Sequence, residues 1–201
     1  MKKIAICTPT AGMVHACHAT TLFGLLAWQG KYAQIVGDDL SMTYLSITGS
    51  VLAHNQRWLV EQSLALGADY ILFLEDDMNV RPEALSHILT HDQPIVGATY
   101  PKRLFPIRFI CHDLQGEEIR VDNDSVGLVE SDHLGMGFTL IKRQVFEDWP
   151  VSIPWFSGEC ADKWFCHEAR KLDFPSYVDL DASRFVEHEG QHRFSWLNTQ
   201  P

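Results

Sequence analysis

The sequence has few basic residues. Its 201 residues include 16 Lys and Arg against 26 Asp and Glu, so the formal net charge is −10 at pH 7. Tight, sequence-independent binding to nucleic acid or to an anionic membrane draws most of its affinity from clustered Lys and Arg. The charge balance argues against both functions. A local basic patch would survive this argument, so a nucleic-acid acceptor is not excluded.

Long apolar runs and paired cysteines are also missing. No apolar run reaches the ~18 residues needed to cross a bilayer, and residues 1–7 lead directly into a strand pattern rather than a signal-peptide core. We therefore expect no membrane span and a cytoplasmic protein. The five cysteines are scattered without a C-x-x-C pair, as is typical of reduced thiols. His15, Cys17 and His18 have no second ligand pair at zinc spacing, so we do not expect zinc.

Apolar patterning predicts one domain over residues 1–201, without repeats or linkers. In the first hundred residues, expected strands and helices alternate, which is typical of an α/β sheet with mostly parallel pairing. The expected strands are Lys3–Cys7, Gln34–Val36, Met42–Ile47, Tyr70–Leu74 and Ile95–Ala98. The expected helices are Thr20–Trp28, with Gly30 as a stop signal, a helix capped by Ser50 that runs to Leu66, and one that begins at Pro82. The buried stripe of the second helix is expected at Leu52, Leu59, Val60, Leu64 and Leu66.

The pattern changes after Tyr100. Short strands without intervening helices are expected at Leu104–Cys111, Glu118–Val121 and Gly127–Val129, which predicts a smaller antiparallel part. The remaining expected elements are a strand at Gly135–Ile141, helices at Gln144–Trp149 and Cys160–Leu172, and strands near Tyr177 and Phe185.

An acidic cluster ends the apolar run Tyr70–Leu74. The run reads as a strand that is buried on both faces, so Glu75, Asp76 and Asp77 would lie at the carboxyl edge of the sheet, where open α/β sheets bind ligands. Three adjacent carboxylates repel one another unless a cation or a proton shares the site, which predicts a divalent metal. The alternative is a solvated turn that only caps the helix beginning at Pro82.

Two other segments are expected at the same edge. The turn that begins Thr8-Pro9-Thr10 follows the first strand. Asn55 and Arg57 lie in the first turns of the helix capped by Ser50, where a ligand-binding role and a solvated helix face both remain open.

Several motifs together resemble the GT-A fold glycosyltransferases, in particular the family-2-like bacterial and phage forms. They are a D-x-D-like strand end after G-A-D-Y-I-L-F-L (Gly67–Asp77), a P-I-V-G-A-x-Y strand (Pro94–Tyr100), a G-x-G-F-x-L-I strand (Gly135–Ile141), a D-x-W-F-C helix start (Asp162–Cys166) and a terminal H-x-G (His188–Gly190). The resemblance covers residues 1–192 and implies a three-layer GT-A-like sandwich. Residues 1–100 would bind the nucleotide sugar and residues 101–201 the acceptor.

The resemblance also implies roles for individual residues. Asp77 and His188 would hold Mn²⁺ or Mg²⁺, and a mixed oxygen and nitrogen ligand set suits Mn²⁺. Glu75 stands where the first Asp of D-x-D is expected, one methylene longer, and would be a third metal residue. Asp162 would deprotonate the acceptor hydroxyl, with Glu159 as a rival because the acidic pair before this helix is here Ala161-Asp162. The expected donor contacts are Thr8, Pro9, Thr10, Asn55, Arg57, Glu75, Asp76 and Arg193.

The implied activity is transfer of a hexosyl or pentosyl group from a nucleotide-diphosphate sugar, with a UDP-sugar favoured, to an acceptor hydroxyl with inversion. A cation would neutralise the charge that gathers on the leaving diphosphate. One alternative is a nucleotidyltransferase on a similar fold, although the turn Thr8–Met13 lacks the basic residue usual there. Another is a glycan-binding or degenerate GT-A domain without turnover. A nuclease is disfavoured by the acidic balance.

Overall fold

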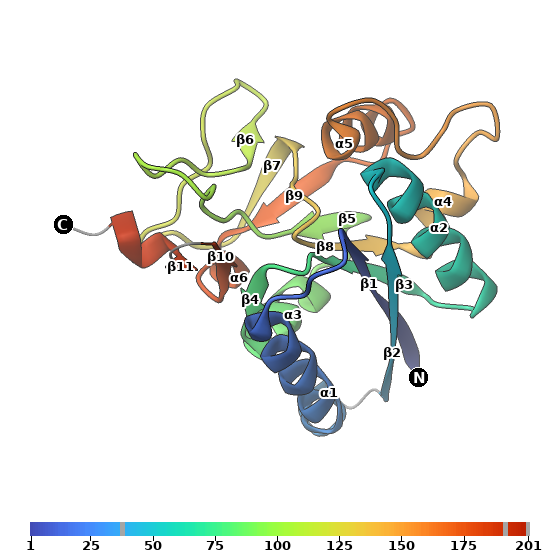
Figure 1. Ribbon diagram of the computed structural model, residues 1–201, viewed down its shortest axis with the longest axis horizontal. Helices are drawn as coiled ribbons and strands as arrows, with labels where there is room; N and C mark the ends of the chain where they lie inside the picture. Colours follow the sequence, from blue (N-terminus) through green and yellow to red (C-terminus); the bar gives the residue numbers. More distant parts are fainter. Residues whose placement is uncertain (37–38, 191–192, 200–201) are drawn as a thin grey trace.

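The first half of the chain alternates strands and helices. The computed structural model describes residues 1–36, 39–190 and 193–199 (Figure 1). In order, the first-half elements are β1 (Lys2–Thr10), α1 (Ala16–Val36), β2 (Leu40–Thr48), α2 (Leu52–Ala65), β3 (Tyr70–Leu74), β4 (Met78–Val80), α3 (Pro82–Thr90) and β5 (Ile95–Gly97). This succession confirms the predicted α/β class.

The second half has shorter elements. They are β6 (His112–Asp113), β7 (Leu128–His133), β8 (Phe138–Lys142), α4 (Arg143–Glu147), α5 (Ala161–Lys171), β9 (Ser176–Asp179), α6 (Leu180–Ser183), β10 (Val186–Glu189), β11 (Arg193–Phe194) and a 3-10 turn at Trp196–Thr199. The expected helix Cys160–Leu172 and the strands near Tyr177 and Phe185 are confirmed within one or two residues.

One large sheet has the strand order β2-β1-β3-β8-β5-β9-β7-β6. β1 pairs in parallel with β2 and β3, and β5 pairs in parallel with β9. β8 lies between β3 and β5 and is antiparallel to both. β7 pairs antiparallel with β9, and β6 antiparallel with β7, so the antiparallel edge belongs to the second half as predicted.

Helices cover both faces of this sheet, which makes three layers (Figure 1). β3 shows why, because its side chains alternate between two apolar cores. Ile71 and Phe73 pack in the core that includes α2, α4 and α5, whereas Leu72 and Leu74 pack in the core that includes α1, α3 and α6. All four side chains are fully buried, and each such burial stabilises the fold by roughly 1.5–3 kcal/mol. A strand of this kind needs an unbroken apolar run.

A second, small sheet brings the end of the chain to the middle of the fold. Its order is β11-β10-β4. β4 begins directly after the acidic cluster, and β10 pairs antiparallel with it so that His188 lies opposite Met78. The Glu189 N–H donates to the Asp77 carbonyl oxygen over 2.8 Å. The strand pairing therefore fixes where His188 stands relative to the acids.

Several sequence expectations are wrong. Gln34–Val36 is not a strand, because α1 continues through Gly30 to Val36. The glycine costs about 1 kcal/mol within a helix, but Tyr32 beyond it is buried against Trp28, with 5.3 Å between the ring centroids, which favours continuation. In Leu104–Cys111 and Glu118–Val121 the structure has isolated bridges at Phe109 and Glu118 instead of strands.

The orientation of α2 also differs from the expectation. Val51 precedes its first residue without a side-chain cap, so Ser50 is not the N-cap. Leu52 and Leu66 are 42% and 54% exposed, while Asn55 and Gln56 are buried. Polar partners explain this, since the Asn55 amide donates to the Gly49 carbonyl oxygen and the Gln56 amide to Asp162.

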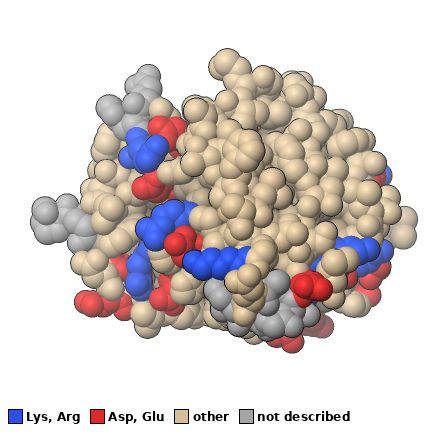
Figure 2. Space-filling view, turned by 90° about the horizontal axis from the view of Figure 1, so that it is seen from below, with Lys and Arg blue, Asp and Glu red and all other residues tan. Residues whose placement is uncertain are grey.

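Charged side chains are unevenly spread over the surface. Figure 2 looks onto the side on which α1 lies in Figure 1, and Lys, Arg, Asp and Glu there leave a broad uncharged area. α1 contributes exposed apolar groups at Phe23 and Leu26, which are 74% and 45% exposed. Among the residues that the structure describes, no helix is long and apolar enough to cross a bilayer.

Candidate functional site

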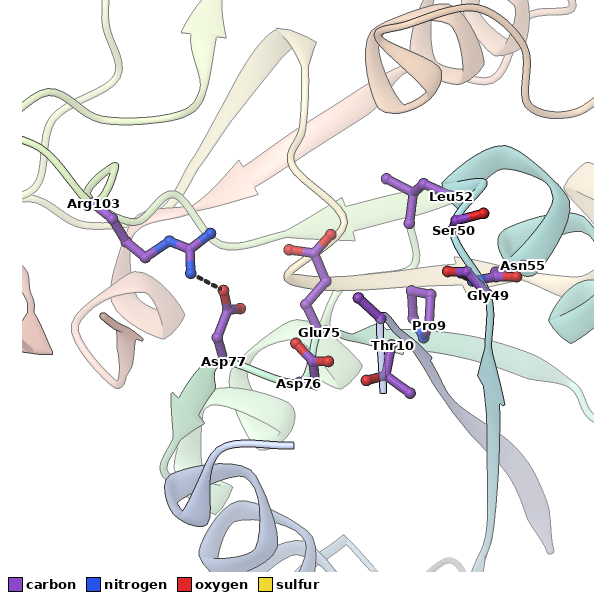
Figure 3. Close-up of a pocket in the computed structure, with 11 residues that line it drawn as sticks. Pro9, Thr10, Gly49, Ser50, Leu52, Asn55, Glu75, Asp76, Asp77 and Arg103 are labelled. Carbon is purple, nitrogen blue, oxygen red and sulfur yellow. Dashed lines mark hydrogen bonds and ion pairs between the residues drawn. The ribbon is translucent and has the colours of Figure 1, made fainter. Parts of the chain in front are cut away.

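A cavity of about 280 Å³ opens at the carboxyl ends of β1, β2 and β3 (Figure 3). The loop after β5 closes one side and the start of α2 the other. The lining residues are Pro9, Thr10, Ala11, Gly49, Ser50, Leu52, Asn55, Glu75, Asp76, Asp77 and Arg103. Pro9 and Thr10, expected in a turn, are the last residues of β1, and they meet the acidic cluster in one pocket, as the positions of the strand ends predict.

Asp77 has cationic partners. It is 7% exposed, and its Oδ2 lies 2.8 Å from Arg103 Nη1 and 3.2 Å from His188 Nε2. Burial raises the pKa of the Asp77 carboxyl, but the His188 hydrogen bond and the positive charges of His188 and Arg103 outweigh burial, so the pKa lies below its ordinary value. Asp77 is thus held as a carboxylate.

The second oxygen of Asp77 lacks a protein partner. Oδ1 is buried and accepts no hydrogen bond from the residues that the structure describes. A buried, unpaired carboxylate oxygen is costly unless a proton, water or cation satisfies it. This unpaired oxygen fits a cation ligand.

His188 is oriented by the backbone. Its Nδ1 lies 3.0 Å from the Pro101 carbonyl oxygen, and its Nε2 faces Asp77 Oδ2. If Nδ1–H donates to that carbonyl, a neutral ring leaves a lone pair on Nε2, which either a proton or a metal can occupy. Metal-binding histidines are commonly oriented through their other nitrogen in this way.

The protein supplies only part of a metal shell. Within residues 1–36, 39–190 and 193–199, no three His, Cys, Asp or Glu side chains are grouped to hold a metal ion. Asp77 and His188 make two ligands, and sites that bind Mg²⁺ or Mn²⁺ together with a phosphate substrate often have few protein ligands. The donor set fits a cation that binds together with a diphosphate.

The surroundings of Glu75 differ from those of Asp77. Burial raises its pKa to about 8, and the negative charges of Asp162, Asp77 and Asp76 add to this effect. Among the neighbouring charges, that of Asp162 on α5 raises the pKa of Glu75 most, and Glu75 holds a proton more readily than an ordinary carboxyl.

Asp162 is fixed by two hydrogen bonds. It stands in the first turn of α5, where the Gln56 amide donates to Oδ1 over 2.9 Å and the Met136 N–H donates to Oδ2 over 3.1 Å. Burial raises its pKa, and both hydrogen bonds oppose the rise. Glu159, the rival residue, is exposed in the loop before α5.

A buried histidine supports the acidic cluster from below. His18 is 1% exposed, its Nδ1 lies 3.1 Å from the Glu75 carbonyl oxygen, and its Nε2 lies 3.2 Å from Thr8 Oγ1. The Thr8 hydroxyl is 2.8 Å from the Leu74 carbonyl oxygen. Burial lowers the pKa of His18, so the neutral ring bridges β1 and the cluster. Thr8 therefore lies beneath the pocket wall and does not line it.

Besides Thr8, two predicted donor contacts do not line the pocket. Arg57 pairs with Glu61 over 2.9 Å and borders a separate surface hollow beside Trp149. Arg193, on β11, pairs with Glu189 over 3.0 Å and Glu187 over 3.4 Å. The pocket instead receives Arg103, which the sequence reading missed. The basic pair that follows Pro101, at the carboxyl end of an expected strand, was the available signal.

Gln56 and His18 were also missed. Both are polar residues on helices, and nothing in their spacing separates a buried supporting role from a solvated one. Their burial follows from partners on distant segments, Asp162 and Glu75.

Comparisons with known proteins place the chain among solved structures by fold. No protein-family model matches the sequence, and no curated protein matches it. A197 from STIV is 18% identical with a TM-score of 0.61, over 94% of this chain and 85% of that one. GalNAc-T7, crystallised with UDP, GalNAc and Mn²⁺, is 8% identical with a TM-score of 0.57, over 94% of this chain and 44% of that one.

A third structure, the catalytic domain of Drosophila beta1,4galactosyltransferase 7 in complex with xylobiose, is 13% identical with a TM-score of 0.48, over 88% of this chain and 64% of that one. The chain thus spans less than half of the GalNAc-T7 chain that it resembles. At these identities the likeness to A197 and GalNAc-T7 establishes a shared fold, the mixed α/β sandwich predicted from the sequence.

Proposed function

We propose that the protein is a metal-dependent glycosyltransferase that moves a sugar from a nucleotide-diphosphate sugar to an acceptor hydroxyl. The observation that carries this proposal is that Asp77 and Glu75 line one pocket but meet different partners. Asp77, with its unpaired oxygen, and His188 suit a cation, while the charge of Asp162 adds to burial in raising the pKa of Glu75. Sugar transfer from a diphosphate needs both a charge-neutralising site and a base.

The donor would lie along the pocket between Arg103 and the start of α2. Pro9, Thr10 and Asn55 line this wall with Asp76. A cation at Asp77 and His188 would act as a Lewis acid on the diphosphate, and Mn²⁺ or Mg²⁺ is expected from the ligand types. Arg103 would add a second positive charge beside the leaving group. GalNAc-T7, with a similar fold, was crystallised with UDP and Mn²⁺, which supports the choice of UDP-sugars as first donors to test.

Asp162 is our candidate for the base. Its two hydrogen bonds fix its direction, and its raised pKa makes it a better proton acceptor than an ordinary carboxylate. Glu159 is instead exposed in the loop before α5. Direct attack by the deprotonated hydroxyl would invert the anomeric configuration. In this scheme Glu75 lies beside the base Asp162 and does not bind the cation.

The proposal also assigns a different substrate to each half of the chain. Residues 1–100 would hold the nucleotide sugar and residues 101–201 the acceptor, although β8 inserts between β3 and β5 so that both halves share one sheet. All five cysteines are unpaired, which supports a reducing, cytoplasmic setting.

A screen of nucleotide-diphosphate sugars by thermal shift, with and without Mn²⁺, tests donor binding. A ligand that binds only the folded state raises its melting temperature, and the rise grows with the ratio of free ligand to the dissociation constant. We therefore expect a rise with a UDP-sugar that depends on Mn²⁺. No rise with any donor would contradict the proposal.

Hydrolysis of the donor then separates the remaining functions. An active transferase releases sugar slowly to water, whereas a degenerate domain binds the donor without turnover. A nucleotidyltransferase would instead release pyrophosphate from a nucleoside triphosphate in the presence of a sugar phosphate. Detection of pyrophosphate without sugar release would favour that alternative.

A further inference from the structure

We infer that Arg103 is a resident counter-ion of Asp77 that a divalent cation displaces, and that the displaced guanidinium then binds the diphosphate. The inference rests on the proposed function and assigns to Arg103 two successive partners. It predicts that the metal and the nucleotide bind cooperatively, because each removes an obstacle to the other.

The loop that carries Arg103 is built to hold it beside Asp77. A bridge between Pro101 and Phe109 closes the base of the loop, and the Lys102 N–H donates to the Arg108 carbonyl oxygen over 2.7 Å. The Pro101 carbonyl oxygen orients His188. One short segment therefore directs both cationic partners of Asp77.

Arg103 and a cation compete for the same carboxylate. Asp77 is nearly buried, and its Oδ2 already accepts contacts from Arg103 and His188. Oδ1 is buried and unpaired. A cation bound between His188 Nε2 and Asp77 would take the space and the charge that Arg103 now satisfies, and two positive groups against one carboxylate oxygen repel each other.

The displaced side chain has a short path to the donor. The Arg103 side chain is 48% exposed and lines the pocket wall opposite Asn55 (Figure 3). Its guanidinium group can therefore turn into the cavity without exposing other buried groups. Guanidinium groups bind phosphate oxygens in pairs. The same residue would thus hold Asp77 ionised before binding and neutralise the diphosphate afterwards.

The test measures two affinities in Arg103→Ala. Calorimetric titration with Mn²⁺ alone should show an affinity about threefold to fivefold higher than that of the wild type. The reason is that the variant lacks the partly exposed ion pair between Arg103 and Asp77, which competes with the cation. Titration with UDP at saturating Mn²⁺ should show binding weakened about tenfold or more, as for a lost charge-assisted hydrogen bond to phosphate. A residue that only stabilises the loop would not shift the two affinities in opposite directions.

Arg108→Ala is the matched control. Arg108 lies in the same loop but pairs with Glu118 over 2.8 Å, so neither affinity should change. Arg103→Lys keeps a charge and should recover part of the UDP affinity. Weaker or unchanged Mn²⁺ binding in Arg103→Ala would overturn the inference, as would a wild-type protein that binds no Mn²⁺ at millimolar concentration. Because the Mn²⁺ titration uses no sugar donor, failure of the transferase activity would leave this result interpretable.

Discussion

Asp77 and Glu75 stand two residues apart in one loop, yet their carboxyl groups meet opposite surroundings. Asp77 faces Arg103 and His188, which lower its pKa, whereas burial and the charge of Asp162 raise the pKa of Glu75 to about 8. Neighbouring acids with pKa values pushed apart can take different chemical roles. Two members of the three-acid cluster therefore differ, since Asp77 faces Arg103 and His188 whereas Glu75 takes up a proton more readily.

The difference comes from elements far away in the sequence. Asp77 meets His188 because β10 pairs with β4. Glu75 meets Asp162 because α5 begins against α2, where Gln56 reaches across to Asp162. Variants that change the surroundings of only one of these two carboxyl groups test this difference.

The largest effect is expected for Asp162→Asn. Loss of a positioned base should lower transfer or donor hydrolysis by at least ~100-fold, with little change in the affinity for UDP and Mn²⁺. Initial rates at saturating donor check this. Glu159→Gln, three residues upstream, should keep nearly full activity, and the reverse outcome would move the base to Glu159.

A smaller effect is expected for Gln56→Met. The Gln56 amide stabilises the Asp162 carboxylate, so its removal raises the pKa of Asp162 further. The acidic limb of the rate profile should therefore move to higher pH, because the base is protonated over a wider range. Donor hydrolysis measured from pH 5 to 9 would show this shift. An unchanged limb with a uniformly lower rate would indicate a packing effect instead.

The smallest effects concern stability without metal. At pH 7, Asp77→Asn removes the pairing with Arg103 and His188 and should lower the melting temperature. Glu75→Gln replaces a carboxyl group that must take up a proton on folding, so it should raise the melting temperature. Each change should be about 1 kcal/mol or less, or roughly 2–4 °C for a chain of this size. Thermal unfolding in the presence of a chelator tests the signs. Two shifts of the same sign would show that the two carboxyl groups share one environment.

Local sequence patterns predict the sheet and the edge at which the site lies. The apolar run Tyr70–Leu74 is continuous because β3 is buried on both faces, so its end could be assigned to the carboxyl edge. Periodicity was less reliable for α2, where Asn55 and Gln56 replace Leu52 and Leu66 on the buried side. Hydrogen-bond partners on other segments determine the orientation of α2, and the helical repeat of apolar residues does not reveal those partners.

Pairings between distant residues were beyond the local patterns. His188 and Asp77 are 111 residues apart, and the strands that join them pair over three residues, too few for a readable pattern. The resemblance to GT-A proteins supplied that pair, but it supplied no residue equivalent to Arg103. The position of Arg103 depends on the closed loop from Pro101 to Phe109, whereas the sequence pattern predicted a strand at Leu104–Cys111.

The most direct test of the division between Asp77 and Asp162 is calorimetric titration of UDP in the presence of Mn²⁺ with the wild type, Asp77→Ala and Asp162→Asn. We expect Asp77→Ala to lose Mn²⁺-dependent binding while remaining folded, since the cation loses its carboxylate ligand. Asp162→Asn should bind as the wild type does. Unchanged affinity in Asp77→Ala, or equal losses in both variants, would contradict the account.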